Sequence, residues 1–206
     1  AEVTNDQVAI IMPVKNAGTY LEECIDSIIA QSHTSWVLYA IDDHSTDDSF
    51  EILSSYADQD ARIHVVKNSG FGIVDALNTS YPLCTHPYIS RMDADDVMPP
   101  SKLKDLLRVL QEGADVATGE VAYFSSEKLG EGFKKYAEWI NYLAKNERQF
   151  DEIYKECPVA SPAWMSTKAK LDECGGIATS GVYPEDYDLV FRWYSKKVNI
   201  KSTNTV

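Results

Sequence analysis

Residues 8–12 read VAIIM, a continuous apolar run rich in branched side chains that is closed by Pro13. Such a run is typical of a β-strand that is buried on both faces, as in the parallel sheets of α/β proteins. Apolar side chains then repeat at helical spacing from Leu21 to Ile29, which predicts an amphipathic helix. The chain therefore begins with a buried strand followed by a helix.

The alternation continues through the first half, where each predicted strand is followed by a helical pattern. Further strands are predicted at 36–41, 63–66 and 88–92. This order predicts an α/β fold with a mostly parallel sheet and helices on both faces. The second half is less regular, and we expect strands at 116–123 and 163–166 and helices through 133–143 and 185–196.

No linker separates two independent domains, so we predict a single domain over residues 1–206. A strand pattern that starts at Val198 is still running at Val206, and we expect the natural protein to continue. Residues 1–7 lack a signal-peptide pattern, so we expect no export.

The composition, 44% hydrophobic and 25% charged, is that of a globular protein and excludes disordered, collagenous or membrane-spanning classes. The net charge of −13 opposes nucleic acid as a main partner. The four cysteines are scattered without CxxC spacing, so they predict neither a zinc site nor a disulfide framework. A reducing cytoplasm is the expected location.

Acidic side chains follow two of the predicted strands, at the point where each strand ends. Asp42-Asp43 comes after the strand at 36–41, and Asp93-Ala94-Asp95-Asp96 comes after the strand at 88–92. Because the carboxyl ends of parallel strands meet at one edge of a sheet, we expect both clusters on one rim. Like charges so close together are costly unless a cation or a ligand offsets them.

Helix capping accounts for some of the polar residues in these loops. We expect Asp47 and Asp48 to cap the helix after the second strand, and Ser101 to cap a later one. Capping does not explain Asp42-Asp43 or the pair formed by Asp93 and Asp95, for which we favour a functional role.

The spacing of Asp93 and Asp95 suits Mg²⁺ or Mn²⁺ held by one or two carboxylates, with water and phosphate oxygens as the other ligands. Such an ion reverses the local sign of the charge, so that a diphosphate could enter. A third cluster, Glu185-Asp186-Tyr187-Asp188, opens the last predicted helix. Its spacing fits acids stabilised by the helix dipole and a general base near a metal equally well.

Together these clusters belong to an ordered set of six motifs that covers about residues 8–199. The motifs are Val14-Lys15-Asn16, Asp42-Asp43-x-Ser45-Thr46-Asp47, Ala76-Leu77-Asn78, Asp93-Ala94-Asp95-Asp96, Gly175-Gly176 and Glu185-Asp186-Tyr187-Asp188-Leu189. In this order they resemble the inverting glycosyltransferases of family 2. The resemblance implies a GT-A fold, with a Rossmann-like nucleotide-sugar-binding half at about 1–115 and an acceptor-binding half at about 116–206.

The resemblance also implies roles for individual residues. Pro13 and Asn16 would border the base of the nucleotide, and Asp43 would accept a hydrogen bond from it. Asp93 would lie near the ribose, and Asn78 belongs to the same nucleotide-sugar site.

In the second cluster, Asp95 would ligate the Mn²⁺ or Mg²⁺ that bridges the two phosphates. Asp186 would be the general base, with Glu185 beside it. His44 stands where the family commonly has glycine, and we interpret it as a loop variant rather than a ligand.

The implied activity is transfer of a sugar from a nucleotide-diphosphate sugar, most simply a UDP-sugar, to an acceptor hydroxyl with inversion. The acceptor would be a glycan or a lipid-linked molecule in cell-surface polysaccharide biosynthesis. The enzyme would work in the cytoplasm, with peripheral association at the inner face of the membrane left open. The sequence does not indicate the oligomeric state.

Two observations bear on the alternatives. A nucleotide-sugar-binding module without transferase activity would keep Asp43 and Asp95 but would need no base. A nucleotidyltransferase and a dinucleotide oxidoreductase are disfavoured, because no glycine-rich basic loop follows the first strand and no GxGxxG follows any strand. Aromatic side chains of the second half include candidates for a sugar-stacking platform, while most are expected to be core: Tyr123, Phe124, Tyr136, Trp139, Tyr142, Trp164, Trp193 and Tyr194.

Overall fold

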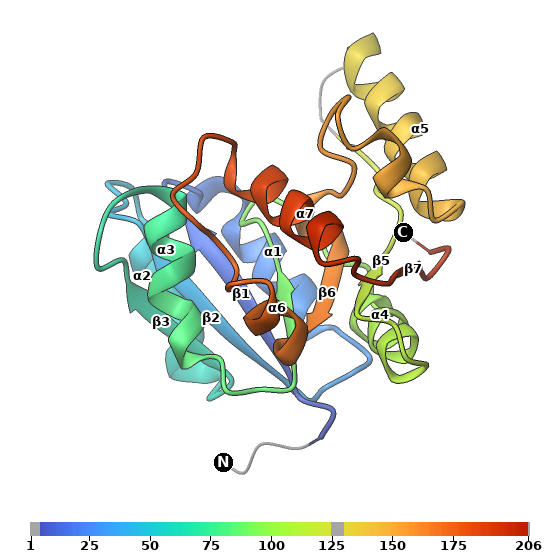
Figure 1. Cartoon of the computed structure of the whole chain (residues 1–206). Helices are drawn as coiled ribbons and strands as arrows, with labels where there is room; N and C mark the ends of the chain where they lie inside the picture. Colours follow the sequence, from blue (N-terminus) through green and yellow to red (C-terminus); the bar gives the residue numbers. More distant parts are fainter. Residues whose placement is uncertain (1–4, 125–129, 206) are drawn as a thin grey trace.

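The computed structural model describes residues 5–124 and 130–205 and has one seven-stranded sheet between two layers of helices (Figure 1). The strand order is β3-β2-β1-β4-β6-β5-β7. The strands are β1 (Val8–Val14), β2 (Trp36–Asp42), β3 (Ile63–Lys67), β4 (Tyr88–Arg91), β5 (Val116–Thr118), β6 (Trp164–Thr167) and β7 (Ile200–Ser202).

The helices fall mostly between these strands, as the alternating pattern predicted. The α-helices are α1 (Gly18–Ile29), α2 (Ser49–Gln59), α3 (Gly72–Ser80), α4 (Lys102–Gln111), α5 (Glu131–Lys145), α6 (Lys168–Glu173) and α7 (Glu185–Ser195). Three short 3₁₀ helices are η1 (Tyr81–Leu83), η2 (Gln149–Glu152) and η3 (Ser161–Ala163). Among the described residues, no helix has the length and apolar character needed to cross a membrane.

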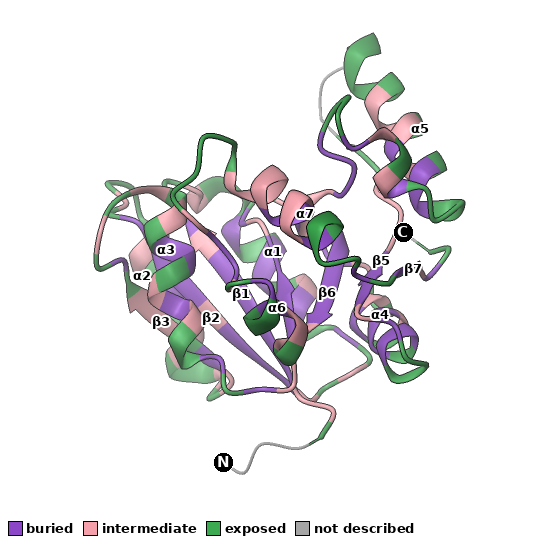
Figure 2. Cartoon of the chain, viewed as in Figure 1, coloured by how far each residue is buried: buried purple, intermediate pink, exposed green. Residues whose placement is uncertain are grey.

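The central strand β1 is buried on both faces, which confirms the prediction from its continuous apolar run. Ile10 and Met12 belong to one hydrophobic core, and Ala9 and Ile11 belong to the other, and all four side chains are fully buried. Helices α1, α2 and α4 close the first core, and α3, α6 and α7 close the second. Figure 2 shows the buried residues following the strands through the middle of the molecule.

The first four strands form the parallel part of the sheet. Strand β1 pairs in parallel with β2 and β4, and β2 pairs in parallel with β3. Pro13 does not end the first strand, because β1 continues to Val14. On the side of β4, the parallel pairing of β1 ends with Ile11 opposite Arg91, so the missing N–H of Pro13 lies beyond the paired part of the two strands.

The second half extends the same sheet in a mixed arrangement. Strand β6 is antiparallel to β4 and β5, and β5 is parallel to β7. The expected strand at 116–123 is wrong in length, because β5 ends at Thr118. Beyond it, the backbone N–H groups leave the regular ladder: that of Glu120 donates to Thr205 O and that of Val121 donates to the side chain of Asn141.

Candidate active site

The carboxyl ends of β1, β2 and β4 meet at one edge of the sheet, which is where the sequence placed the acidic clusters. Val14 lies opposite Asp42 in the parallel register, and the Asp43 N–H donates to Val14 O at 2.8 Å. On the other side of β1, the Met92 N–H donates to Ile11 O at 2.9 Å. The loops that start at Asp43 and Asp93 therefore leave the sheet on the same rim.

A cleft of about 650 Å³ opens beside this rim and brings distant acidic residues together. Asp93, Asp95 and Asp96 enter it from the loop after β4, and Asp186 enters it from the first turn of α7. The other lining residues are Tyr20, Glu23, Val121, Ala122, Tyr123, Phe124, Tyr136, Val159, Ala160, Ser161 and Pro162. Three of the aromatic residues named as sugar-stacking candidates thus line the cleft, whereas Trp164 and Trp193 are core.

Two carboxyl groups in the loop of residues 93–96, here called the acidic loop, have raised pKa values. Burial raises the pKa of Asp96 to about 6, and the neighbouring charges of Asp93 and Asp95 act in the same direction. Burial also raises the pKa of Asp93, although Arg91 opposes the change. Nearby, burial lowers the pKa of Lys102 to about 8. A cation in the cleft would relieve the repulsion among these carboxylates.

Arg91, the last residue of β4, links this loop to α7, and the sequence analysis did not identify it. Its Nε lies 3.3 Å from Asp93 Oδ1, and its Nη1 lies 3.0 Å from Glu185 Oε1. The Arg91 side chain is only 6% exposed. The signal in the sequence was a single basic residue at the end of an otherwise uncharged strand, directly before the acidic motif.

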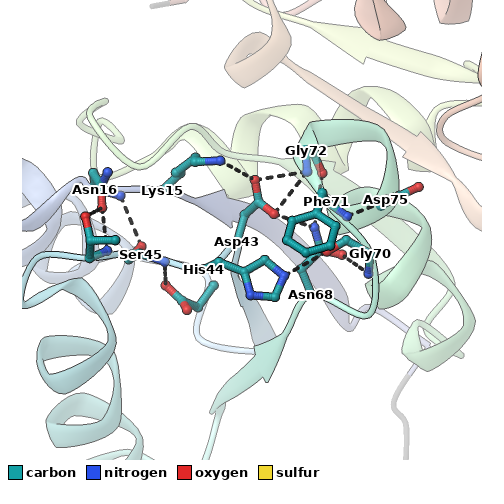
Figure 3. Close-up of polar contacts among 12 residues, drawn as sticks. Lys15, Asn16, Asp43, His44, Ser45, Asn68, Gly70, Phe71, Gly72 and Asp75 are labelled. Carbon is teal, nitrogen blue, oxygen red and sulfur yellow. Dashed lines mark hydrogen bonds and ion pairs between the residues drawn. The ribbon is translucent and has the colours of Figure 1, made fainter.

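Asp43 lies on the same rim but is not among the residues that line the cleft. Its carboxylate accepts hydrogen bonds from Asn68 Nδ2 at 2.7 Å and from the Gly72 N–H at 3.0 Å, and Lys15 Nζ lies 3.3 Å away (Figure 3). Burial favours a higher pKa for Asp43, but the hydrogen bonds from Asn68, Gly72 and Lys15 outweigh it and lower the pKa. Asp43 thus organises the loop that precedes α3.

Two neighbouring loop residues have left-handed backbone conformations. Asn16 has φ +50°, and its Oδ1 accepts a hydrogen bond from the Thr46 N–H at 2.8 Å. His44 has φ +56°, its Nε2 lies 2.8 Å from Gly70 O, and its ring stacks on Phe71 at 4.5 Å (Figure 3). The left-handed backbone explains why glycine would suit position 44.

The remaining predicted binding residues lie away from the cleft lining. Pro13 is part of β1, and Asn78 is exposed on α3. Asp42 is buried, and its Oδ1 accepts a hydrogen bond from the Ser45 N–H at 3.4 Å. Among the nucleotide-sugar residues implied by the resemblance, Asp93 alone lines the cleft in the part of the chain that the structure describes.

The capping predictions are correct for one residue of three. Asp47 Oδ1 accepts a hydrogen bond from the N–H of Ser49, the first residue of α2, and Asp47 Oδ2 accepts one from the Gly18 N–H. Asp48 makes no capping hydrogen bond, because its carboxylate lies against Gly18 instead. Ser101 makes none either, because its hydroxyl donates to Asp105 Oδ2 at 2.7 Å.

The acidic loop offers the right ligand chemistry for a hard divalent cation. Within residues 5–124 and 130–205, no three acidic, histidine or cysteine side chains form a complete metal cage. Mg²⁺ and similar ions need no such cage when a substrate supplies phosphate oxygens, because one or two carboxylates are then enough. Asp95, exposed at the cleft and two residues from Asp93, fits this requirement.

Comparison with known proteins defines the family. The model for "Glycosyl transferase family 2" matches residues 9–176, and the chain belongs to this family. Among curated relatives, the putative teichuronic acid biosynthesis glycosyltransferase TuaG of Bacillus subtilis is 36% identical over 108 residues, which cover 51% of this chain and 42% of TuaG. The chain spans only 25–44% of the length of the first curated relatives that it matches.

Solved structures show the same GT-A fold. TarS 1–349 from S. aureus in complex with UDP-GlcNAc has a TM-score of 0.73 at 18% identity, covering 95% of this chain and 55% of TarS 1–349. The mannosyltransferase PcManGT from Pyrobaculum calidifontis, in complex with GDP-Man and Mn²⁺, has a TM-score of 0.69 at 16% identity, covering 95% and 54% of the two chains. At these identities the likeness concerns the fold.

Proposed function

We propose that this chain is the transferase domain of an enzyme that moves a sugar from a nucleotide-diphosphate sugar, most simply a UDP-sugar, to an acceptor hydroxyl with inversion. The observation that carries the proposal is that Asp95 and Asp186, from distant parts of the sequence, line one cleft. Family membership and the complexes of TarS with UDP-GlcNAc and PcManGT with GDP-Man support a nucleotide-sugar donor.

Asp186 is the proposed general base. It is half-buried in the first turn of α7, where the helix dipole favours negative charge, and its Oδ1 accepts a hydrogen bond from the Tyr187 N–H at 2.7 Å. Its second oxygen is the one proposed to take the proton from an attacking hydroxyl. A single displacement assisted by one base inverts the configuration at the anomeric carbon.

The donor would lie along the rim, with its diphosphate at Asp95. Asp95, with Asp93 beside it, would hold Mn²⁺ or Mg²⁺. The ion supplies Lewis-acid stabilisation of the departing nucleotide diphosphate. Mn²⁺ in the PcManGT complex supports this assignment. Pro13, Asn16, Asp43 and Asn78 remain the proposed surroundings of the nucleoside.

The acceptor would bind in the same cleft. Tyr123, Phe124 and Tyr136 line it, and aromatic faces stack on sugar rings. We propose a glycan or lipid-linked acceptor and a role in cell-surface polysaccharide assembly, supported by the likeness to TuaG. We propose that the enzyme works in the cytoplasm, and a lipid-linked acceptor would bring it to the inner face of the membrane.

The test begins with a panel of UDP- and GDP-sugars screened for Mn²⁺-dependent thermal stabilisation, followed by transfer and donor-hydrolysis assays. Asp186→Asn should reduce kcat by about 100-fold or more, the contribution typical of general base catalysis, and leave donor affinity nearly unchanged. Glu131→Gln, an exposed acid in the first turn of α5, is the control.

Normal turnover by Asp186→Asn would remove Asp186 from the role of base. A wild-type chain that binds the donor but neither hydrolyses nor transfers it would favour the alternative, a nucleotide-sugar-binding module.

A further inference from the structure

The guanidinium of Arg91 is buried between two acidic side chains from distant parts of the chain. One is Asp93, in the loop after β4, and the other is Glu185, the first residue of α7. The Glu185 side chain is 13% exposed, so the contact between Arg91 and Glu185 is well shielded from water. Ion pairs of this kind lose little strength to screening by salt.

Arg91 belongs to the middle strand of the sheet. Strand β4 pairs with β1 on one side and β6 on the other, and Arg91 itself lies opposite Ile11. At the far end of α7, Arg192 binds carbonyl oxygens of the preceding loop, including Cys174 O at 2.9 Å. The last turn also packs on the sheet through Trp193, whose ring lies edge-on to Trp164 of β6. The contact with Glu185 holds the first turn of α7 to β4.

Stability alone does not explain a buried arginine at this position. Removing a guanidinium from water is costly, and an apolar side chain of similar size often stabilises a protein as well or better. An arginine does what an apolar side chain cannot, because its planar fork contacts two carboxylates in fixed directions. Here one carboxylate belongs to the loop of residues 93–96, and the other belongs to α7, the helix that carries Asp186.

We propose that Arg91 is a positioning residue that sets the place of Asp186 relative to the loop of residues 93–96, by holding Glu185. The proposal rests on the proposed function, in which Asp186 is the base. A displacement of about 1 Å in a reacting group can cost about 100-fold in rate. Loss of the contact between Arg91 and Glu185 should therefore lower kcat and leave the KM for the donor nearly unchanged.

The test compares Glu185→Ala, Arg91→Met, the double variant and Arg91→Lys in the full chain. Arg108→Met, which breaks an exposed pair with Glu112 on α4, is the matched control. Two readouts are taken. The first is hydrogen exchange of the amides of Tyr187 and Asp188, which donate to Asp186 Oδ1 and to Pro184 O in the first turn of α7. The second is kcat and KM with the UDP- or GDP-sugar selected by the donor screen.

We expect Glu185→Ala and Arg91→Met each to speed exchange of the Tyr187 and Asp188 amides at least tenfold and to lower kcat about 100-fold, with the double variant no worse than the poorer single variant. Arg91→Lys should restore only part of kcat, because an ammonium lacks the planar fork. Glu185→Ala keeps Arg91 paired with Asp93, so it tests the contact even if Arg91→Met folds poorly.

Unchanged exchange of the Tyr187 and Asp188 amides, or unchanged kcat in Glu185→Ala while Asp186→Asn is inactive, would overturn the positioning role and leave the proposed function standing. Full turnover by Asp186→Asn would instead remove Asp186 from the role of base, the part of the proposed function on which the positioning role rests. The exchange data would still report whether Arg91 holds the first turn of α7.

Discussion

Asp43 is buried, with only 4% of the residue exposed. Its carboxylate accepts hydrogen bonds from the Asn68 side chain and from the Gly72 N–H, both in the segment that follows β3. Its pKa in the folded chain lies below the ordinary value of 3.8. A carboxyl with a depressed folded pKa contributes stability above its unfolded pKa, and this contribution is lost as pH falls through the folded pKa. Asp43 therefore links stability to pH in the acid range.

Asp43→Asn should lower the free energy of unfolding by about 1–3 kcal/mol at pH 7, because the amide cannot accept from Gly72 and Lys15 as a carboxylate does. The difference from wild type should persist at pH 5 and shrink below the unfolded pKa of 3.8. Urea denaturation at several pH values measures it, with exposed Asp58→Asn as the control. A difference that stays constant down to the lowest pH would contradict this role.

At the scale of single residues, the sequence indicated which acidic residues belong to the candidate site, but it did not indicate which residues contact them. Asp95 and Asp186 could be placed because each follows or opens a recognisable element on a known edge of the sheet. Arg91 and Asn68 could not, because their contacts depend on how far each loop bends back, which no periodic pattern encodes. The left-handed backbone of His44 could be anticipated only through the resemblance, since position 44 is commonly glycine there.

At the scale of elements, hydrophobic periodicity predicted most of the first half. Strands β1 to β4 and the helices between them form because each apolar pattern is typical of one kind of element, a buried strand or an amphipathic helix, and helices cover both faces of the sheet. The second half was harder, because β5 and β7 have only three residues each and gain their order from pairing with neighbours. The antiparallel orientation of β6 is likewise set by tertiary contacts and not by its own four residues.

Helix α7 is fixed at its C-terminal half by Arg192. Its guanidinium donates to Gly176 O at 2.7 Å, to Ile177 O at 3.2 Å and to Asp188 Oδ2 at 2.8 Å. Arg192→Lys should reduce the free energy of unfolding by about 1–3 kcal/mol, because an ammonium cannot serve these acceptors together. Arg148→Lys, at an exposed pair, should change it by less than about 0.5 kcal/mol. Equal effects in chemical denaturation would contradict the anchoring role.

The whole molecule carries a net charge of −13, yet the proposed donor is itself an anion. The proposed cation between the loop of residues 93–96 and the diphosphate would make these two facts compatible. The division into a nucleotide-sugar-binding half and an acceptor-binding half stays a prediction. The structure adds that strands β5, β6 and β7 extend the same sheet as β1 to β4, so the two halves share one scaffold.

Calorimetric titration of UDP, with Mn²⁺ and then with EDTA, tests the central claim most directly. The account predicts that wild type binds UDP at least tenfold more tightly with Mn²⁺, a difference of about 1.4 kcal/mol, that Asp95→Ala abolishes this difference, and that Asp186→Asn retains it. UDP affinity that is equal with Mn²⁺ and with EDTA, or that responds to Mn²⁺ as well in Asp95→Ala as in wild type, would contradict it.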